Sequence, residues 1–298
     1  MTMTVYEVGP RDGLQNEAAL VTTPDKIAFV DRLTAAGLPV IEVSAFVSPK
    51  WVPQMADAGD VFAGITRRPG TRYAALVPNA KGLERAIAAG VTEVAVFAAA
   101  SETFSTRNIN QSIDESFATY DEVLAAAKAG GLRVRGYLST CFGCPFEGDV
   151  PIARVVSLTQ RLLDLGVYEV AVSDTIGVAH PGQVRAVLKS LTAAVPAAKL
   201  ALHFHDTRGT ALANVLASLD FGIETFDSSA GGLGGCPYAP GASGNLATED
   251  LLYMLHGLGI ETGVSLDKVY AASSAIAPAL DHLLPSRYVQ ARSKSVGP

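Results

Sequence analysis

The most constraining feature of this sequence is a unit that recurs roughly every 30 residues. Each unit has a short run of aliphatic and β-branched residues, a turn, and a helical run that ends near a glycine. Strands that alternate with helices in this way predict a parallel sheet. Eight strands are expected, at residues 4–8, 39–45, 72–77, 93–98, 133–140, 168–173, 199–205 and 224–228.

The helices expected between these strands favour a closed barrel. They include residues 23–36, 80–89, 113–129, 152–165, 181–194 and 210–221, and glycines at 37, 90, 130, 166 and 222 are expected to end several of them in a left-handed conformation. Eight βα units without a break in composition favour a (β/α)₈ TIM barrel over an open, doubly wound sheet. Residues 246–298 are expected to add the last barrel helix and a short helical appendage, so that residues 1–298 form a single catalytic domain.

The charge of the sequence disfavours some partners, and its hydropathy and cysteine content indicate a cellular location. The formal net charge is −6 and no dense Lys/Arg block occurs, which disfavours nucleic acids and anionic membranes as partners. No apolar run approaches the ~18 residues of a membrane span, and the start, MTMTVYEVG, does not resemble a signal peptide. Three cysteines are a small and odd number, which makes a disulfide framework improbable. We therefore expect a cytoplasmic protein with free thiols.

Polar residues gather where six of the expected strands end. In a TIM barrel the active site is built at the carboxyl ends of the strands, so these residues should converge in space. They are the segment 9–17 (GPRDGLQNE) after the first strand, Glu42 on the second, Cys141 and Cys144 after the fifth, Ser173 to Thr175 at the sixth, His203 to Asp206 at the seventh, and Cys236 and Asn245 in a glycine-rich loop after the eighth.

The sharpest local signal is the pair His203 and His205. Residues two apart on a strand point to the same side, so the two imidazoles can bind one ion. They could equally be structural histidines whose ring nitrogens are satisfied by hydrogen bonds. Asp12 and Asn245 would complete a set of two nitrogen and two oxygen ligands. Such a set suits a six-coordinate divalent cation, with Mg²⁺ or Mn²⁺ the leading candidates.

Arg11 and Glu42 form a second expected pair. An arginine beside Asp12 could be a surface ion pair, but at a strand end its guanidinium could stabilise an enolate oxygen. Glu42 lies among apolar residues and would be costly to bury unpaired, which makes Arg11 its expected partner.

The cysteines divide into two groups. The loop around Cys236 holds too many glycines to pack a core and is typical of a mobile segment over a site, although a free cysteine is usually a small buried hydrophobe. Cys141 and Cys144 form a C-x-x-C pair with no second thiol pair, so a structural role is favoured over a zinc site.

Four stretches carry a resemblance to a known family. They are residues 8–17 (VGPRDGLQNE), 48–57 (SPKWVPQMAD), 174–177 (DTIG), and 234–239 (GGCPYA) continuing to 244–250 (GNLATED). With a match that runs nearly end to end, the chain resembles the 3-hydroxy-3-methylglutaryl-CoA lyases, within the superfamily of metal-dependent aldolase and Claisen-type enzymes on TIM barrels. The resemblance implies cleavage of this acyl-CoA thioester to acetyl-CoA and acetoacetate.

The resemblance also implies roles for individual residues. Asp12, His203, His205 and Asn245 would bind the divalent cation, Arg11 would stabilise the enolate and Glu42 would hold Arg11. Asp174 or His203 would help to remove the 3-hydroxyl proton, Cys236 would protonate the enolate, and Gln15 and Thr175, with Arg11, are expected to contact the substrate. A homodimer is expected by the same analogy.

Several departures from the family pattern concern the substrate. Arg208 replaces a frequent tyrosine, Ser173 replaces a glycine, Ala18 stands where a CoA-side lysine is frequent, and residues 281–298 match poorly. A lyase of the same mechanism for a bulkier branched 3-hydroxyglutaryl-CoA is therefore a second candidate. A Claisen synthase or pyruvate aldolase on the same scaffold is a third, and a non-catalytic barrel that only binds ligands is a more remote fourth.

Overall fold

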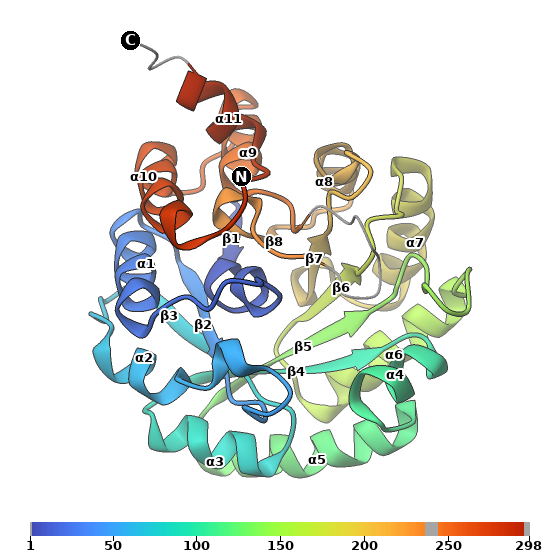
Figure 1. The fold of residues 1–298 in the computed structure, drawn as a ribbon. Coiled ribbons are helices and arrows are strands. Elements are labelled where there is room, and N and C mark those ends of the chain that lie inside the picture. The colour runs from blue at the N-terminus through green and yellow to red at the C-terminus, as the bar shows by residue number, and fades with distance from the viewer. Residues whose placement is uncertain (1, 236–243, 295–298) are drawn as a thin grey trace.

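The expected barrel is confirmed by a computed structural model, which describes residues 2–235 and 244–294 (Figure 1). Eight parallel strands close into a ring in the order in which they occur in the chain, and β8 pairs with β1. Each strand begins and ends within two residues of its expected position. The strands are β1 (Thr4–Glu7), β2 (Val40–Ala45), β3 (Arg72–Leu76), β4 (Glu93–Ala99), β5 (Arg133–Ser139), β6 (Val170–Asp174), β7 (Leu200–Phe204) and β8 (Thr225–Ser228).

Helices surround the strands, as Figure 1 shows. They are α1 (Thr23–Ala35), α2 (Ala58–Gly64), α3 (Ala80–Ala88), α4 (Glu102–Ile109), α5 (Ile113–Ala129), α6 (Ile152–Leu165), α7 (Pro181–Ala194), α8 (Ala211–Leu219), α9 (Thr248–Gly257), α10 (Leu266–Ile276) and α11 (Arg287–Lys294). α10 packs against α1 and so joins the C-terminal helices to the first helix around the barrel. α11 forms the short C-terminal appendage. None of the helices in the described residues is long and apolar enough to cross a membrane.

Local sequence explains where the helices begin and end. Ser112 and Glu115 form a reciprocal capping box at the start of α5, in which each side chain accepts a hydrogen bond from the other's backbone N–H. The glycines at 37, 90, 166 and 222 have positive φ, as expected. The expectation for Gly130 is wrong, because its φ is −82° and the next residue, Gly131, has a φ of +71°. A second glycine in the pair allows the reversal to occur one residue later.

The barrel interior is partly polar. β5 contributes Arg135 and Tyr137, both buried, and alternation along the strand places them on the same side. The guanidinium of Arg135 lies over the Tyr6 ring, 3.9 Å from its centroid, and 5.0 Å from that of Tyr137. A charged residue at the centre of a barrel is stable only when it is paired. One of the carboxylates that pair with Arg135 also contacts the candidate site.

Candidate active site and metal centre

The segment after β1 is a short π-helical turn, Gly9–Gly13, that presents Arg11 and Asp12 to the carboxyl end of the barrel. The backbone N–H groups of residues 11, 12 and 13 all donate to the carbonyl oxygen of Val8. A Cβ atom at Gly9 would lie 2.6 Å from Glu7 Oε1, and one at Gly13 would lie 2.7 Å from Ser229 Oγ. A larger residue at either end of this turn would therefore have to displace a buried side chain.

Arg11 lies between two carboxylates. Its Nε donates to Glu42 Oε2 over 2.5 Å, and its Nη1 donates to the Asp12 carboxylate. Glu42 is fully buried on β2, where an irregularity in the pairing with β3 falls between residues 42 and 44. The Tyr137 hydroxyl also donates to Glu42 Oε2, over 3.2 Å. The Arg11–Glu42 pair expected from the sequence thus forms, and the tyrosine holds the same oxygen.

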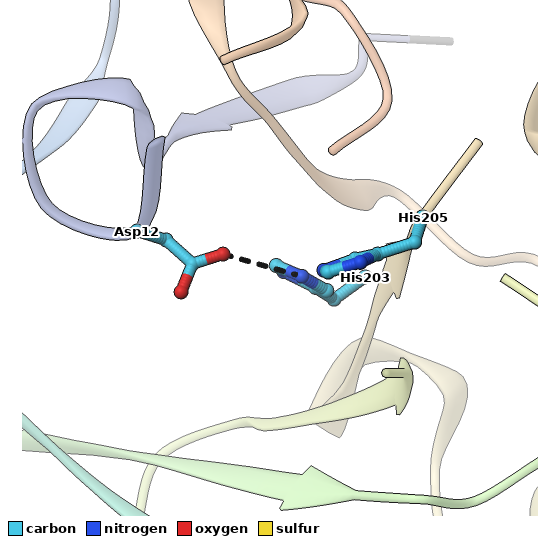
Figure 2. A group of neighbouring side chains, drawn as sticks. All are labelled: Asp12, His203 and His205. Atoms are coloured by element: carbon cyan, nitrogen blue, oxygen red, sulfur yellow. Dashed lines mark ion pairs between the residues drawn. The ribbon is translucent and has the colours of Figure 1, made fainter. Parts of the chain in front are cut away.

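Asp12, His203 and His205 meet at one point. One ligand atom from each lies within 4.8 Å of the others, and Figure 2 shows the three side chains turned toward one another. His203 Nε2 is 3.8 Å from Asp12 Oδ2. His203 lies on β7 and His205 just beyond it, so the strand end supplies both imidazoles, while the turn after β1 supplies the carboxylate.

Asn245 reaches the same place through a local pairing of the chain. It forms an isolated antiparallel bridge with His205, and the flanking Leu246 N–H donates to the Phe204 carbonyl oxygen over 3.0 Å. Within the described residues, Asn245 Oδ1 and His205 Nδ1 are buried without a hydrogen-bond partner. Unpaired buried acceptors are costly, and a bound cation would be a partner for them. The donor set therefore fits a divalent metal ion.

The protonation states of Asp12 and His205 also suit metal binding. Burial favours the neutral form of Asp12, but the adjacent Arg11 and the two histidines outweigh it and lower the pKa of Asp12 to about 2. Burial, together with neighbouring His203, lowers the pKa of His205 to about 4. Near neutral pH the site thus offers an ionised carboxylate and a neutral imidazole, which are the forms that bind metals.

Sequence reasoning missed a second layer behind His203. Asp227, at 1% exposure on β8, lies with its Oδ2 3.1 Å from His203 Nδ1. The same carboxylate accepts from Arg135 Nη1 and Nη2 over 3.1 and 2.7 Å, and Arg135 Nε donates to Glu169 Oε1 over 2.9 Å. A charged residue in the middle of an expected strand, as at Arg135, was the signal that could have pointed to these residues.

A cavity of about 530 Å³ opens above the cluster. Arg11, Asp12, His203 and His205 line it, and so do the expected substrate contacts Gln15 and Thr175. Exposed residues that line it come from the segments after β1 to β4, with Arg107 in α4, and include Asn16, Ser48, Trp51, Asn79 and Arg107. The space is large enough for the acyl part of a substrate and is open to solvent.

Asp174 and Cys236 are the remaining site residues expected from the sequence. Asp174 is buried, and its two carboxylate oxygens accept from the backbone N–H groups of Val178 and Ala179, each over 3.0 Å. It does not line the cavity in the described structure, although its neighbours Ser173 and Thr175 do. Cys236 lies outside the described residues, which resume at Gly244.

The two cysteines of the C-x-x-C pair are both buried. Cys141 Sγ donates to the Leu138 carbonyl oxygen, and Cys144 Sγ lies 2.9 Å from Ser101 Oγ. Burial raises the pKa of the Cys141 thiol. The surroundings thus suit the structural role that the sequence favoured.

Two buried glutamates hold the turn that leads into the glycine-rich loop. Glu7 accepts from Gly9 and Ala230 N–H and from Thr248 Oγ1, over 2.7 to 2.9 Å. Glu249 accepts from Gly231 N–H over 2.8 Å and from the Ser273 hydroxyl over 2.5 Å. No cation pairs with either in the described structure, and burial raises the pKa of each to about 7.

The chain is similar in sequence to a known family and to individual proteins within it. The HMGL-like family model matches residues 2–276. The chain is 54% identical over 290 residues to the mitochondrial hydroxymethylglutaryl-CoA lyase of Bos taurus, covering 97% of this chain and 89% of the relative. It is 51% identical over 291 residues to the cytoplasmic 3-hydroxy-3-methylglutaryl-CoA lyase of Rattus norvegicus, covering 98% of this chain and 85% of the relative.

A solved structure is also similar over almost the whole chain. It is an HMG-CoA lyase from Acinetobacter baumannii in complex with coenzyme A and 3-methylmalate. It superposes with a TM-score of 0.94 at 40% identity and covers 100% of this chain and 97% of its own.

Proposed function

Because this chain belongs to the HMGL-like family, we propose that it is a carbon–carbon lyase that cleaves 3-hydroxy-3-methylglutaryl-CoA to acetyl-CoA and acetoacetate. The single observation that carries the proposal is the cluster of Asp12, His203 and His205 beside Arg11 on the floor of the cavity. Cleavage next to a thioester needs a sink for negative charge at that place.

The proposed metal ligands are Asp12, His203, His205 and Asn245. A bound Mg²⁺ or Mn²⁺ would polarise substrate oxygens as a Lewis acid. The chain's own contribution is to keep Asp12 charged and to align the two imidazoles from one strand end.

Arg11 is proposed to stabilise the enolate oxygen of acetyl-CoA. Its guanidinium is held by Glu42 and Asp12, so its position is fixed before the substrate binds. Glu42 is held in turn by the Tyr137 hydroxyl. A donor fixed in advance stabilises developing charge without reorganising during the reaction.

Asp174 and His203 both remain proposed bases for the 3-hydroxyl proton, since both Asp174 oxygens accept backbone hydrogen bonds and Asp174 does not line the cavity in the described structure. Both ring nitrogens of His203 are committed, Nδ1 to Asp227 and Nε2 to the ligand cluster. Burial raises the pKa of Asp174, which makes it a stronger base than an exposed aspartate. Once the hydroxyl proton is lost, the C2–C3 bond breaks, acetoacetate forms, and the enolate of acetyl-CoA remains to be protonated at C2.

Cys236 is proposed as the donor of that last proton. A thiol with an ordinary pKa of about 8.5 is mostly protonated at neutral pH and can serve as an acid. Cys236→Ser keeps the size of the side chain but supplies a weaker acid, and we expect the turnover number to fall by about 10²- to 10⁴-fold. Turnover near the wild-type rate with an unchanged pH profile would assign the proton to another group.

We further propose that the chain forms one catalytic domain and a homodimer. The packing of α10 against α1 supports the first, because it joins the C-terminal helices to the start of the barrel. A cytoplasmic location is also proposed. The relatives include both cytoplasmic and mitochondrial proteins, and the rat relative supports the former.

A panel assay tests the proposed activity. The purified protein is stripped with EDTA, supplied with Mg²⁺ or Mn²⁺, and incubated with 3-hydroxy-3-methylglutaryl-CoA and with bulkier branched 3-hydroxyglutaryl-CoA thioesters. We expect acetyl-CoA and acetoacetate from the first substrate only when metal is added, and loss of both products in the Arg11→Met control. Preference for a bulkier thioester would assign that thioester as the substrate. Pyruvate release would indicate a pyruvate aldolase, and net condensation would indicate a Claisen synthase. A metal-loaded protein that processes none of these substrates would contradict the proposal.

A further inference from the structure

We propose that Asp227 is a positioning residue that fixes the His203 imidazole so that its Nε2 atom serves as the metal ligand. The proposal rests on the cation site assumed in the proposed function. It concerns a residue that lies behind the site and does not line the cavity.

The contacts of Asp227 determine which atom of His203 carries the proton. Both Asp227 oxygens accept from the Arg135 guanidinium, so the carboxylate is ionised and has no proton to donate. Its contact with His203 therefore requires the proton on Nδ1. A neutral imidazole protonated at Nδ1 has its lone pair at Nε2, the atom that faces Asp12.

His205 provides a contrast within the same cluster. Its Nδ1 is buried and has no hydrogen-bond partner among the described residues. Within the described part of the chain, the protein thus sets the tautomer of one ligand histidine through a carboxylate and has no such contact at Nδ1 of the other. A carboxylate behind a metal-binding histidine typically changes metal affinity by about 10- to 100-fold when it is lost.

An asparagine at position 227 should reverse the arrangement. If its amide nitrogen replaces Oδ2, it donates to His203 Nδ1 and moves the ring proton to Nε2, where it opposes metal binding. In that orientation the amide also opposes the Nη1 donor of Arg135, across the longer 3.1 Å contact. The opposite orientation keeps an oxygen on His203 but sets the amide against Nη2 across the shorter 2.7 Å contact, and this disfavours it. The side chain keeps its size in either orientation.

Glu169 offers a matched control. It is the other carboxylate on Arg135, and its Oε1 accepts from Nε of that arginine over 2.9 Å, whereas Asp227 accepts from Nη1 and Nη2. Glu169→Gln removes one negative charge from the same guanidinium without changing the partner of the imidazole. A purely structural role of this ion-pair network would make the two variants behave alike.

The test measures Mn²⁺ binding to the full chain by electron paramagnetic resonance of the free ion, without substrate. We expect Asp227→Asn to raise the Kd for Mn²⁺ by about 10- to 100-fold and Glu169→Gln to leave it close to the wild-type value. Equal weakening in both variants, wild-type affinity in Asp227→Asn, or no Mn²⁺ binding by the wild type would overturn the proposal. Because substrate is absent, normal Mn²⁺ results together with an inactive enzyme would count against the lyase assignment alone.

A measurement on the wild-type protein keeps the proposal testable if Asp227→Asn does not fold. In Mg²⁺-loaded protein with ¹⁵N-labelled histidine, long-range proton–nitrogen correlation spectra report the tautomer of each ring. We expect the His203 proton on Nδ1, and a proton on Nε2 would overturn the proposal.

Discussion

Arg11 and Arg135 are two buried arginines with the same kind of surroundings and different access to the cavity. Each contacts two carboxylates, and both guanidinium groups lie near the Tyr137 ring, 5.4 and 5.0 Å from its centroid. The Arg11 side chain is 7% exposed and lines the cavity, whereas that of Arg135 is fully buried. The difference in access suits Arg11 for the substrate contact proposed above, whereas Arg135 can contact only neighbouring side chains.

The largest effect should come from Arg135, because it is the arginine that pairs with both Asp227 and Glu169. Within the described residues, Arg135→Met leaves Asp227 with the His203 contact alone and Glu169 without its ion-pair partner. We expect the free energy of unfolding to fall by about 3 to 5 kcal/mol, the usual cost of breaking a buried ion pair from one side. Urea unfolding followed by circular dichroism measures this loss, and wild-type stability would show that Arg135 is not needed to hold these groups.

A slightly smaller effect, in activity instead of stability, is expected at Arg11. Arg11→Lys keeps a positive charge next to Glu42 and Asp12 but loses the planar fork of donors. The turnover number should fall by about 10²- to 10³-fold with little change in the Michaelis constant and in the melting temperature. Steady-state kinetics measure the turnover number and the Michaelis constant, and a thermal melt measures the melting temperature. A defect confined to the Michaelis constant, or a drop in melting temperature as large as that of Arg135→Met, would remove the distinction between the two arginines.

The smallest effect concerns carboxylates that lack an arginine. Asp12 and Asp227, beside Arg11 and Arg135, have lowered pKa values, whereas burial raises the pKa of Glu7 and Glu249 from 4.5 to about 7. Between pH 4.5 and 7 the folded protein therefore binds more protons at these two glutamates than the unfolded chain does. Their contribution to stability is fully present below pH 4.5 and is lost as the pH rises through 7.

We accordingly expect the free energy of unfolding to decrease between pH 5 and 8 by on the order of 1 kcal/mol per pH unit for each glutamate. Glu7→Gln and Glu249→Gln should each make that decrease shallower. Denaturant unfolding at several pH values measures the slope. A slope that neither variant changes would mean that these glutamates are charged in the folded protein throughout this range.

The sequence predicted the strands well because their signal is local. Aliphatic runs bounded by turns and glycines mark a buried strand wherever it lies, and a barrel places every strand's carboxyl end on one face. That rule alone brought Asp12, Glu42, His203 and Asn245 to one place before any distance was known. The family resemblance added roles, several of which stay predictions.

Features that depend on packing between distant segments could not be predicted in the same way. In the π-helical turn at Gly9–Gly13, for example, Gly13 lies against Ser229, which follows β8 at the other end of the barrel sequence. The link from Arg135 through Asp227 to His203 joins three strands. Asp174 was expected at the site, yet the backbone of its own loop occupies its carboxylate, which only the course of residues 175–179 reveals.

Pairing between β1 and β8 has a consequence for how the chain acquires its structure during synthesis. The first strand has no second neighbour until the last strand has been made, and Asn245 meets His205 only after that. Contacts between residues so far apart in sequence form slowly, because a long loop must close first. The ring of strands should therefore remain open, with the edges of β1 and whichever strand has been made last exposed, until most of the chain has left the ribosome. The metal-binding cluster would then be among the last parts of the protein to assemble.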